Sequence, residues 1–174
     1  MELDSPKSRS SEGLLASVVA VIGRTVSWLT VVMVILTFSV VILRYGLDLG
    51  WIWLQESIIY LHASVIMMVA AWAFQQDEHV RVDIFYREKS ARHKAWINLL
   101  GTLILLVPFS SFLLIIGWNY VSASWAAMET SREAGGLPMV YLLKSLILVL
   151  PVLLLIQTFC TARICLLTIK KNQQ

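Results

Sequence analysis

Long stretches without a charged residue divide the chain into four apolar segments. The stretches are residues 25–43, 57–76, 95–128 and 145–162, and a charged residue bounds each of them on both sides. A helix that crosses the hydrocarbon core of a bilayer needs about 20 mostly apolar residues, and in lipid its backbone polar groups must bond within the helix. The pattern therefore predicts an all-α integral membrane protein with four transmembrane helices.

Two segments depart from the length of a simple crossing. Residues 14–22 are apolar, but Arg24 separates them from the first stretch. We expect them to form an amphipathic interfacial helix on the inner leaflet, with a longer, tilted first helix as the alternative. The third stretch would extend roughly 50 Å as a helix, against a hydrocarbon core of about 30 Å. A steep tilt, a bend at Pro108 or projection beyond the outer surface would accommodate it, and its polar outer third favours projection.

The distribution of lysine and arginine indicates the orientation. With the N-terminus inside, all but three of the 14 basic residues lie on the inner side, the exceptions being Arg44, Arg132 and Lys144. Cytoplasmic loops of membrane proteins carry such an excess, so we expect both termini in the cytoplasm. The expected organisation is a cytoplasmic N-terminal segment with the interfacial helix (1–23), a four-helix membrane domain (24–163) and a cytoplasmic tail (164–174).

Composition excludes two broad classes of protein. Hydrophobic residues make up 58% and charged residues 14% of the chain, where soluble domains usually have about 45–50% and about 25%. Neither a soluble globular domain nor a disordered one fits these values. The formal net charge of +3 would suit a nucleic-acid partner, but in a membrane protein it follows from basic inner loops. We therefore predict no nucleic-acid binding.

The four apolar stretches carry little that could catalyse a reaction or bind a substrate. They contain no Asp, Glu, Lys or Arg, and His62 is their only histidine, whereas haem in a helical bundle usually takes two facing ligands. Cys160 and Cys165 form no CxxC pair and are expected to be small apolar fillers. We therefore predict no catalytic, substrate-binding or metal-binding residue and no cofactor, with His62 as a hydrogen-bonded interior residue or a partner contact.

Ionisable residues gather where the predicted helices meet the outer membrane surface. Arg44 and Tyr45 end the first helix. Glu56 lies in the first turn of the second, where a carboxylate favours the helix N-terminus and could pair with Arg44. Lys144 lies in the first turn of the fourth helix, where a cation opposes the dipole. Its side chain is expected either to reach the outer headgroups or to pair with a partner chain.

Two further boundary segments join the predicted helices. The turn at Gly135, Gly136 and Pro138 sets the start of the fourth helix. On the inner side, residues 77–83 alternate charged residues with valines. This segment is expected to form a strand-like connector, a capped helix start or a docking edge.

The boundary segments together resemble the small membrane subunit, of the Q or DctQ type, of tripartite ATP-independent periplasmic (TRAP) transporters. The resemblance covers most of the chain, roughly residues 24–163. The residues that carry it are Arg44, Tyr45, Trp51, Trp53, Leu54, Gln55 and Glu56, then His79, Val80, Arg81, Val82 and Asp83, and then Gly135, Gly136, Leu137, Pro138, Tyr141, Leu142, Leu143 and Lys144.

The resemblance implies a small, non-catalytic subunit of a secondary transporter in the bacterial inner membrane. Such subunits scaffold a large (M-type) membrane subunit, which carries the substrate and sodium sites, and help to dock a periplasmic substrate-binding protein for sodium-coupled uptake of organic acids. By this analogy, residues 118–132 and the loop 44–56 face the periplasm and contact the binding protein. Arg81, Asp83 and the following basic stretch would stay at the inner surface, against anionic lipid or the large subunit.

Two functions of other classes remain open at this point. One is a homo-oligomeric structural membrane protein of the tetraspan type, which would be stable alone and would have no large partner. The other is a membrane-anchored redox or haem subunit, against which the histidine count argues. Neither the solute nor the number of coupling ions follows from the sequence.

Overall fold

The computed structural model describes residues 14–76 and 90–171. Within them the chain is helical, and no strand occurs in the part described. The helices are α1 (Leu14–Ser27), α2 (Leu29–Gly46), α3 (Ile52–Gln75), α4 (Ala91–Gly101), the π-helical segment η2 (Thr102–Leu106), α5 (Val107–Ala126) and α6 (Val140–Lys171).

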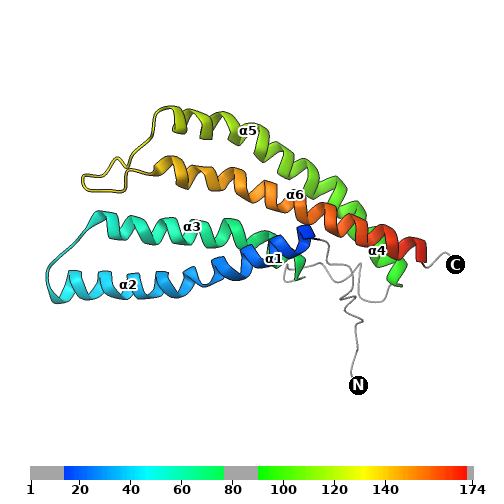
Figure 1. The fold of residues 1–174 in the computed structure, drawn as a ribbon, viewed down its shortest axis with the longest axis horizontal. Helices are drawn as coiled ribbons and strands as arrows, with labels where there is room; N and C mark the ends of the chain where they lie inside the picture. The colour runs from blue at the N-terminus through cyan, green and yellow to red at the C-terminus, as the bar shows by residue number, and fades with distance from the viewer. Residues whose placement is uncertain (1–13, 77–89, 172–174) are drawn as a thin grey trace, which may run out of the picture.

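Four helical stretches are long and apolar enough to cross a membrane, which confirms the expected four-helix membrane protein. They are residues 15–46, 52–75, 91–126 and 140–171. In Figure 1, α6 lies between α5 and α3, and α2 lies on the far side of α3. The α2–α3 and α5–α6 connections lie at the same end of the bundle, which we call the loop end, and α1 and the last turns of α6 lie at the other, the open end.

The N-terminal helix continues almost without interruption into the first long helix. Trp28, between α1 and α2, keeps helical dihedral angles, with φ −65° and ψ −21°. Because Arg24 is exposed, its charge does not end the helix, and the boundary expected after residue 23 falls inside α1. Val19 of α1 is only 1% exposed, and Gly23 lies so close to Trp72 of α3 that a Cβ there would overlap the indole. The position of α1 relative to a bilayer surface stays a prediction.

The third long helix is confirmed, and it contains an irregular segment next to its proline. The run from Ala91 to Ala126 comprises 36 residues. The N–H of Val107 bonds to the carbonyl of Thr102, five residues back, instead of four. Pro108 has no N–H to donate, and its ring would collide with the carbonyl of Ile104 in a regular α-helix. One π-helical turn widens the backbone there, and Figure 1 shows the α4–α5 stretch as a curved rod.

The buried core is small and centres on α6. One cluster joins α1, α3 and α6 through Val19, Ala71, Leu153 and Leu154, and a second joins α4 and α6 through Ala95, Leu99, Cys165 and Ile169. In contrast, α2 has no buried residue at all. The chain thus leaves most of its apolar side chains to be covered by lipid or by another protein.

Candidate functional site at the loop end

The connection between α5 and α6, residues 127–139, folds back on itself. Within it the N–H of Ser131 donates to the carbonyl of Leu137 at 3.1 Å, and the N–H of Gly136 donates to that of Glu133 at 3.0 Å. Gly135 has φ +80°, a left-handed conformation that favours glycine. These bonds give the connection a defined shape, so the predicted turn at Gly135 and Gly136 has a conformational reason.

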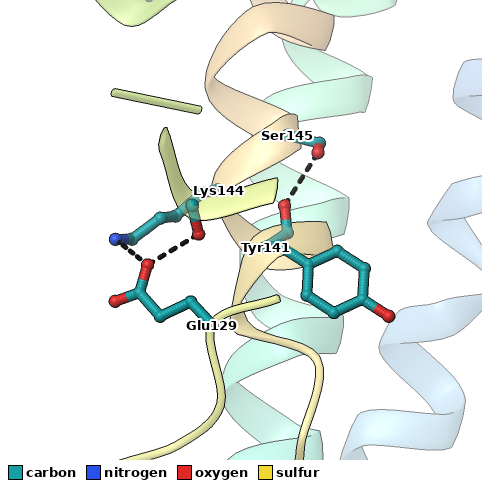
Figure 2. Close-up of polar contacts among 5 residues, drawn as sticks. Glu129, Tyr141, Lys144 and Ser145 are labelled. Atoms are coloured by element: carbon teal, nitrogen blue, oxygen red, sulfur yellow. Dashed lines mark hydrogen bonds and ion pairs between the residues drawn. The ribbon is translucent and has the colours of Figure 1, made fainter. Parts of the chain in front are cut away.

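Glu129 ties the end of α5 to the start of α6. Its carboxylate accepts a hydrogen bond from the Ser124 hydroxyl at 2.6 Å and pairs with the Lys144 ammonium at 2.5 Å. Figure 2 shows Lys144 and Glu129 extending toward each other from the helix and from the connection. The two side chains are 17% and 29% exposed, and the ammonium of Lys144 also lies 4.2 Å from the ring centre of Tyr120. Lys144 therefore has its counter-charge within its own chain.

The contacts of Glu129 with Lys144 and Ser124 lower the pKa of Glu129 and neutralise the charge at the start of α6. The hydrogen bond from Lys144, followed by that from Ser124, holds the pKa of the Glu129 carboxyl below its ordinary value of 4.5. A cation in the first turn of a helix is unfavourable because the positive end of the helix dipole lies there. The Glu129 carboxylate offsets that repulsion, so the α6 N-terminus can carry Lys144.

Glu56 ties α3 to the same connection. Its Oε1 accepts a short hydrogen bond from the Ser131 hydroxyl, and its Oε2 accepts the N–H of Leu137 at 2.6 Å. A Cβ on Gly136 would come within 2.8 Å of Glu56 Oε2 and would overlap Ser131. Only glycine leaves room for this contact. We call Glu56, Ser124, Glu129, Ser131 and Lys144 the carboxylate network.

An aromatic contact closes the corner between α5 and α6. The indole N–H of Trp125 donates to the Ser145 hydroxyl at 2.8 Å, and that hydroxyl donates to the Tyr141 carbonyl at 2.8 Å. The Trp125 and Tyr141 rings meet edge to face, with their centres 4.7 Å apart. Three helices, α3, α5 and α6, are thus joined at one end of the bundle by hydrogen bonds, an ion pair and ring packing.

The structure brings together some of the residues that the sequence singled out, but not all. Glu56, Gly136 and Lys144 meet around residues 127–139, and Pro138 lies exposed in that connection. The suggested pair of Arg44 with Glu56 does not form among the described residues. The Glu56 carboxylate instead accepts hydrogen bonds from Ser131 and Leu137, one at each oxygen.

The α2–α3 connection presents aromatic side chains outward. Arg44 and Tyr45 are exposed at the end of α2, and Tyr45 is 82% exposed. The rings of Trp51 and Trp53 stack with their centres 6.2 Å apart, and both remain exposed. His79, Arg81 and Asp83 lie outside the described residues, so their expected roles stay predictions.

Sequence reasoning missed Glu129, Ser124 and Ser131. A usable signal was present, since Glu129 ends the third charge-free stretch and Lys144 precedes the fourth. Two antiparallel helices joined by a short loop bring such ends together, so opposite charges there could have been paired. The serines give no comparable signal, because their partners depend on the path of the loop.

The arrangement is suited to fixing a surface. In residues 14–76 and 90–171 no group of three or more His, Cys, Asp or Glu side chains could hold a metal ion. Both carboxylate oxygens of Glu56 and Oε2 of Glu129 already accept hydrogen bonds from their own chain. The network therefore holds the loop end in one shape, with exposed aromatic side chains around it.

One polar side chain in an apolar helix points away from the bundle. His62 of α3 is exposed, as are Ile59 and Ile66 on the same helix face. The interior position suggested for His62 is thus wrong for this chain alone. Ionisable side chains in membrane helices almost always face a protein interior or a water-filled cavity, so this face is a candidate contact surface.

Comparison with known proteins gives one family and one curated relative. The family model for the DctQ component of tripartite ATP-independent periplasmic transporters matches residues 33–167. The chain is 30% identical over 110 residues to the C4-dicarboxylate TRAP transporter small permease protein DctQ of Vibrio cholerae serotype O1. That match covers 62% of this chain and 45% of the relative, so the chain spans about half the relative's length. No solved structure matches.

Proposed function

The chain belongs to the family of DctQ components of TRAP transporters, and on that premise we infer that it scaffolds a large transport subunit and helps a periplasmic substrate-binding protein to dock. As a family member it is a multi-pass membrane protein and a transporter subunit. In our proposal it is non-catalytic and lies in the inner membrane with both termini in the cytoplasm. Sodium-coupled uptake of an organic acid then takes place in the large subunit.

The carboxylate network carries the docking part of the proposal. It joins α3, α5 and α6 at the loop end through Glu56, Glu129 and Lys144. A surface that is ordered before its partner arrives loses less conformational entropy on binding. Exposed aromatic side chains are frequent anchors of protein interfaces, and Trp51, Trp53 and Trp125 are all exposed at this end. The loop end in this orientation faces the periplasm.

The exposed helix faces carry the scaffolding part. His62 lies on an outward face between Ile59 and Ile66, and lipid tails offer an imidazole no hydrogen-bond partner. A second membrane protein with a polar group at this depth would satisfy it. The helix α2 has no buried residue, so its side chains offer a further surface to such a partner. We expect the large subunit to cover at least the His62 face.

The scaffolding role can be tested by a pull-down in mild detergent. The full chain carries a tag at its C-terminus, and mass spectrometry identifies what co-purifies. A roughly stoichiometric, much larger multi-helix membrane protein is expected. Replacement of His62 by Leu should reduce its recovery, whereas replacement of the exposed Thr25 in α1 by Val is the control. A clean homo-oligomer without a larger partner would contradict the proposal and favour the structural tetraspan alternative.

Docking needs a separate test, because a scaffold need not contact the binding protein. A photo-activatable residue at the exposed Met128 in the α5–α6 connection should crosslink in whole cells to a soluble periplasmic protein. The same residue at Leu105, which is 70% exposed in the middle of the third long helix, should give only lipid or membrane-protein products. Identical products at the two positions would rule out docking at the loop end.

A further inference from the structure

The open end of the bundle contains a cavity that the proposed function does not use. It has a volume of about 380 Å³ and lies along the last turns of α6. Its lining residues are Phe159, Ala162, Arg163, Leu166, Leu167 and Lys170. Four of the six are apolar and two are cationic. Phe159, Leu166 and Leu167 are each more than half exposed, so the cavity is a shallow depression that opens away from the bundle.

The two cations of this cavity have no counter-charge in the described part of the chain. Neither Arg163 nor Lys170 forms an ion pair or a side-chain hydrogen bond within residues 14–76 and 90–171. They are seven residues apart, which places them on one helix face about 10.5 Å apart along the axis. Lys144 at the other end of α6 shows the contrast, since it pairs with Glu129. An anion from outside the chain would satisfy both cations.

The depth of these residues along α6 matches the edge of a bilayer. Arg163 lies roughly 28 Å beyond Lys144 at about 1.5 Å per residue, and the hydrocarbon core is about 30 Å thick. If Lys144 marks one boundary of the hydrocarbon, Arg163 marks the other, and Lys170 reaches the headgroup level. Phe159, four residues before Arg163, then lies within the hydrocarbon. The cavity thus runs from the acyl-chain region to the headgroup region.

From this arrangement we propose that the open end of α6 binds one anionic phospholipid. Its phosphate lies between Arg163 and Lys170, and a stretch of one acyl chain lies in the cavity against Phe159, Leu166 and Leu167. Long basic side chains on a helix can bend along the axis, so both reach a single headgroup between them. A soluble anion would leave the apolar wall uncovered, and a zwitterionic lipid would bring its own cation to the site. The charge and the apolar lining together select an anionic lipid.

Native mass spectrometry of the purified full chain tests this proposal. The protein is titrated in mild detergent with phosphatidylglycerol, with phosphatidylcholine and with inorganic phosphate. Basic residues at a membrane surface each strengthen anionic-lipid binding by roughly fivefold. The double substitution Arg163→Gln and Lys170→Gln should therefore weaken phosphatidylglycerol binding by about thirtyfold. A second variant, Leu166→Trp, fills the cavity at unchanged charge and should also weaken it.

The matched control removes the same two charges elsewhere. Arg132→Gln with Lys171→Gln changes the net charge equally, and Lys171 is the direct neighbour of Lys170 but does not line the cavity. Equal losses in the control and test variants would overturn the site in favour of general surface charge. Phosphatidylcholine binding as strong as phosphatidylglycerol binding, or saturable binding of phosphate alone, would overturn the choice of ligand. If the double variant does not fold, the Leu166→Trp variant still tests the proposal. Phosphatidylglycerol binding by this variant as strong as that of the unmodified chain would reject it.

Discussion

The two ends of the bundle differ in whether their charged side chains have partners within the described chain. At the loop end Glu56 and Glu129 take their hydrogen bonds from Ser131, Leu137, Ser124 and Lys144, all within the chain. At the open end Arg163 and Lys170 line a cavity without a counter-charge among the described residues. A surface that satisfies its own polar groups keeps its shape in the absence of a partner. An unsatisfied one depends on what the membrane or another protein supplies.

The largest expected effect concerns the side of the membrane on which each end lies. Ala126 and Ala91 are exposed at opposite ends of the same long helical stretch. With Cys160 and Cys165 replaced by Ala, a cysteine at Ala126 should react with an impermeant thiol reagent in intact spheroplasts. A cysteine at Ala91 should react only after permeabilisation. The reverse pattern would invert the proposed topology, and protection of both would place the loop end inside the membrane or an interface.

A substitution in the turn between α5 and α6 should remove the order of the loop end and so make it more like the open end. Gly136→Leu would drive a side chain into Ser131 and Glu56 and separate Glu56 from the connection. Overpacking of this kind costs typically about 1–3 kcal/mol. Thermal unfolding in detergent should show this loss of stability as a lower unfolding midpoint, and limited proteolysis should cut the connection between α5 and α6 faster.

The control for this change is Gly50→Leu in the other loop, where nothing lies within 4 Å of a new Cβ. It makes the same chemical replacement at the same end of the bundle. Equal destabilisation by both variants would mean that the general loss of glycine, and not the contact with Glu56, limits stability.

The smallest effect is a pH response that belongs to the loop end alone. Since the pKa of Glu129 is lower in the folded chain than its ordinary value of 4.5, the folded state binds the proton less readily than the unfolded state. The stabilisation is therefore complete above about pH 4.5 and is lost as the pH falls through the lower, folded pKa. The hydrogen bonds from Ser131 and Leu137 also lower the pKa of the Glu56 carboxyl, which contributes in the same direction. The unfolding midpoint should fall slightly in that range, and Glu129→Gln should remove the Glu129 part of this response.

Glu133→Gln serves as the matched control for the pH measurement. Glu133 lies in the same connection and is exposed, and within residues 14–76 and 90–171 its carboxylate accepts no hydrogen bond. A pH response unchanged in Glu129→Gln but absent in Glu133→Gln would show that the wrong carboxylate has been assigned.

The helices were predictable because their cause is local. Each charge-free stretch reaches the roughly 17–25 residues of a membrane crossing, and a backbone in lipid must bond to itself, so four helices follow whatever they pack against. Pro108 likewise signalled an irregularity, which the π-helical turn at Thr102–Leu106 supplies. Arg24 does not interrupt the helix, because its side chain is exposed within α1, and the division between the N-terminal segment and the membrane domain at residue 23 stays a prediction.

Contacts between segments far apart in the sequence were not predictable in the same way. Glu56 bonds to Ser131 and Leu137, which follow it by more than 70 residues. The fit of Gly23 against Trp72 depends equally on how α1 crosses α3. The favourable position of Glu56 in a first helical turn was visible in the sequence, but its partner was not. The nearer charge, Arg44, was the wrong choice because the loop donors reach the carboxylate instead.

Hydropathy and charge along the chain determined that this protein is a helical membrane protein, because the transfer of backbone and side chains into lipid depends on each segment by itself. The motifs along the chain carried enough information to place it in its family. Only the tertiary structure decided that Lys144 is neutralised by Glu129, while Arg163 and Lys170 find no counter-charge within residues 14–76 and 90–171. Pairing energies depend on distances of a few ångströms between side chains, and those distances exist only once the helices have packed.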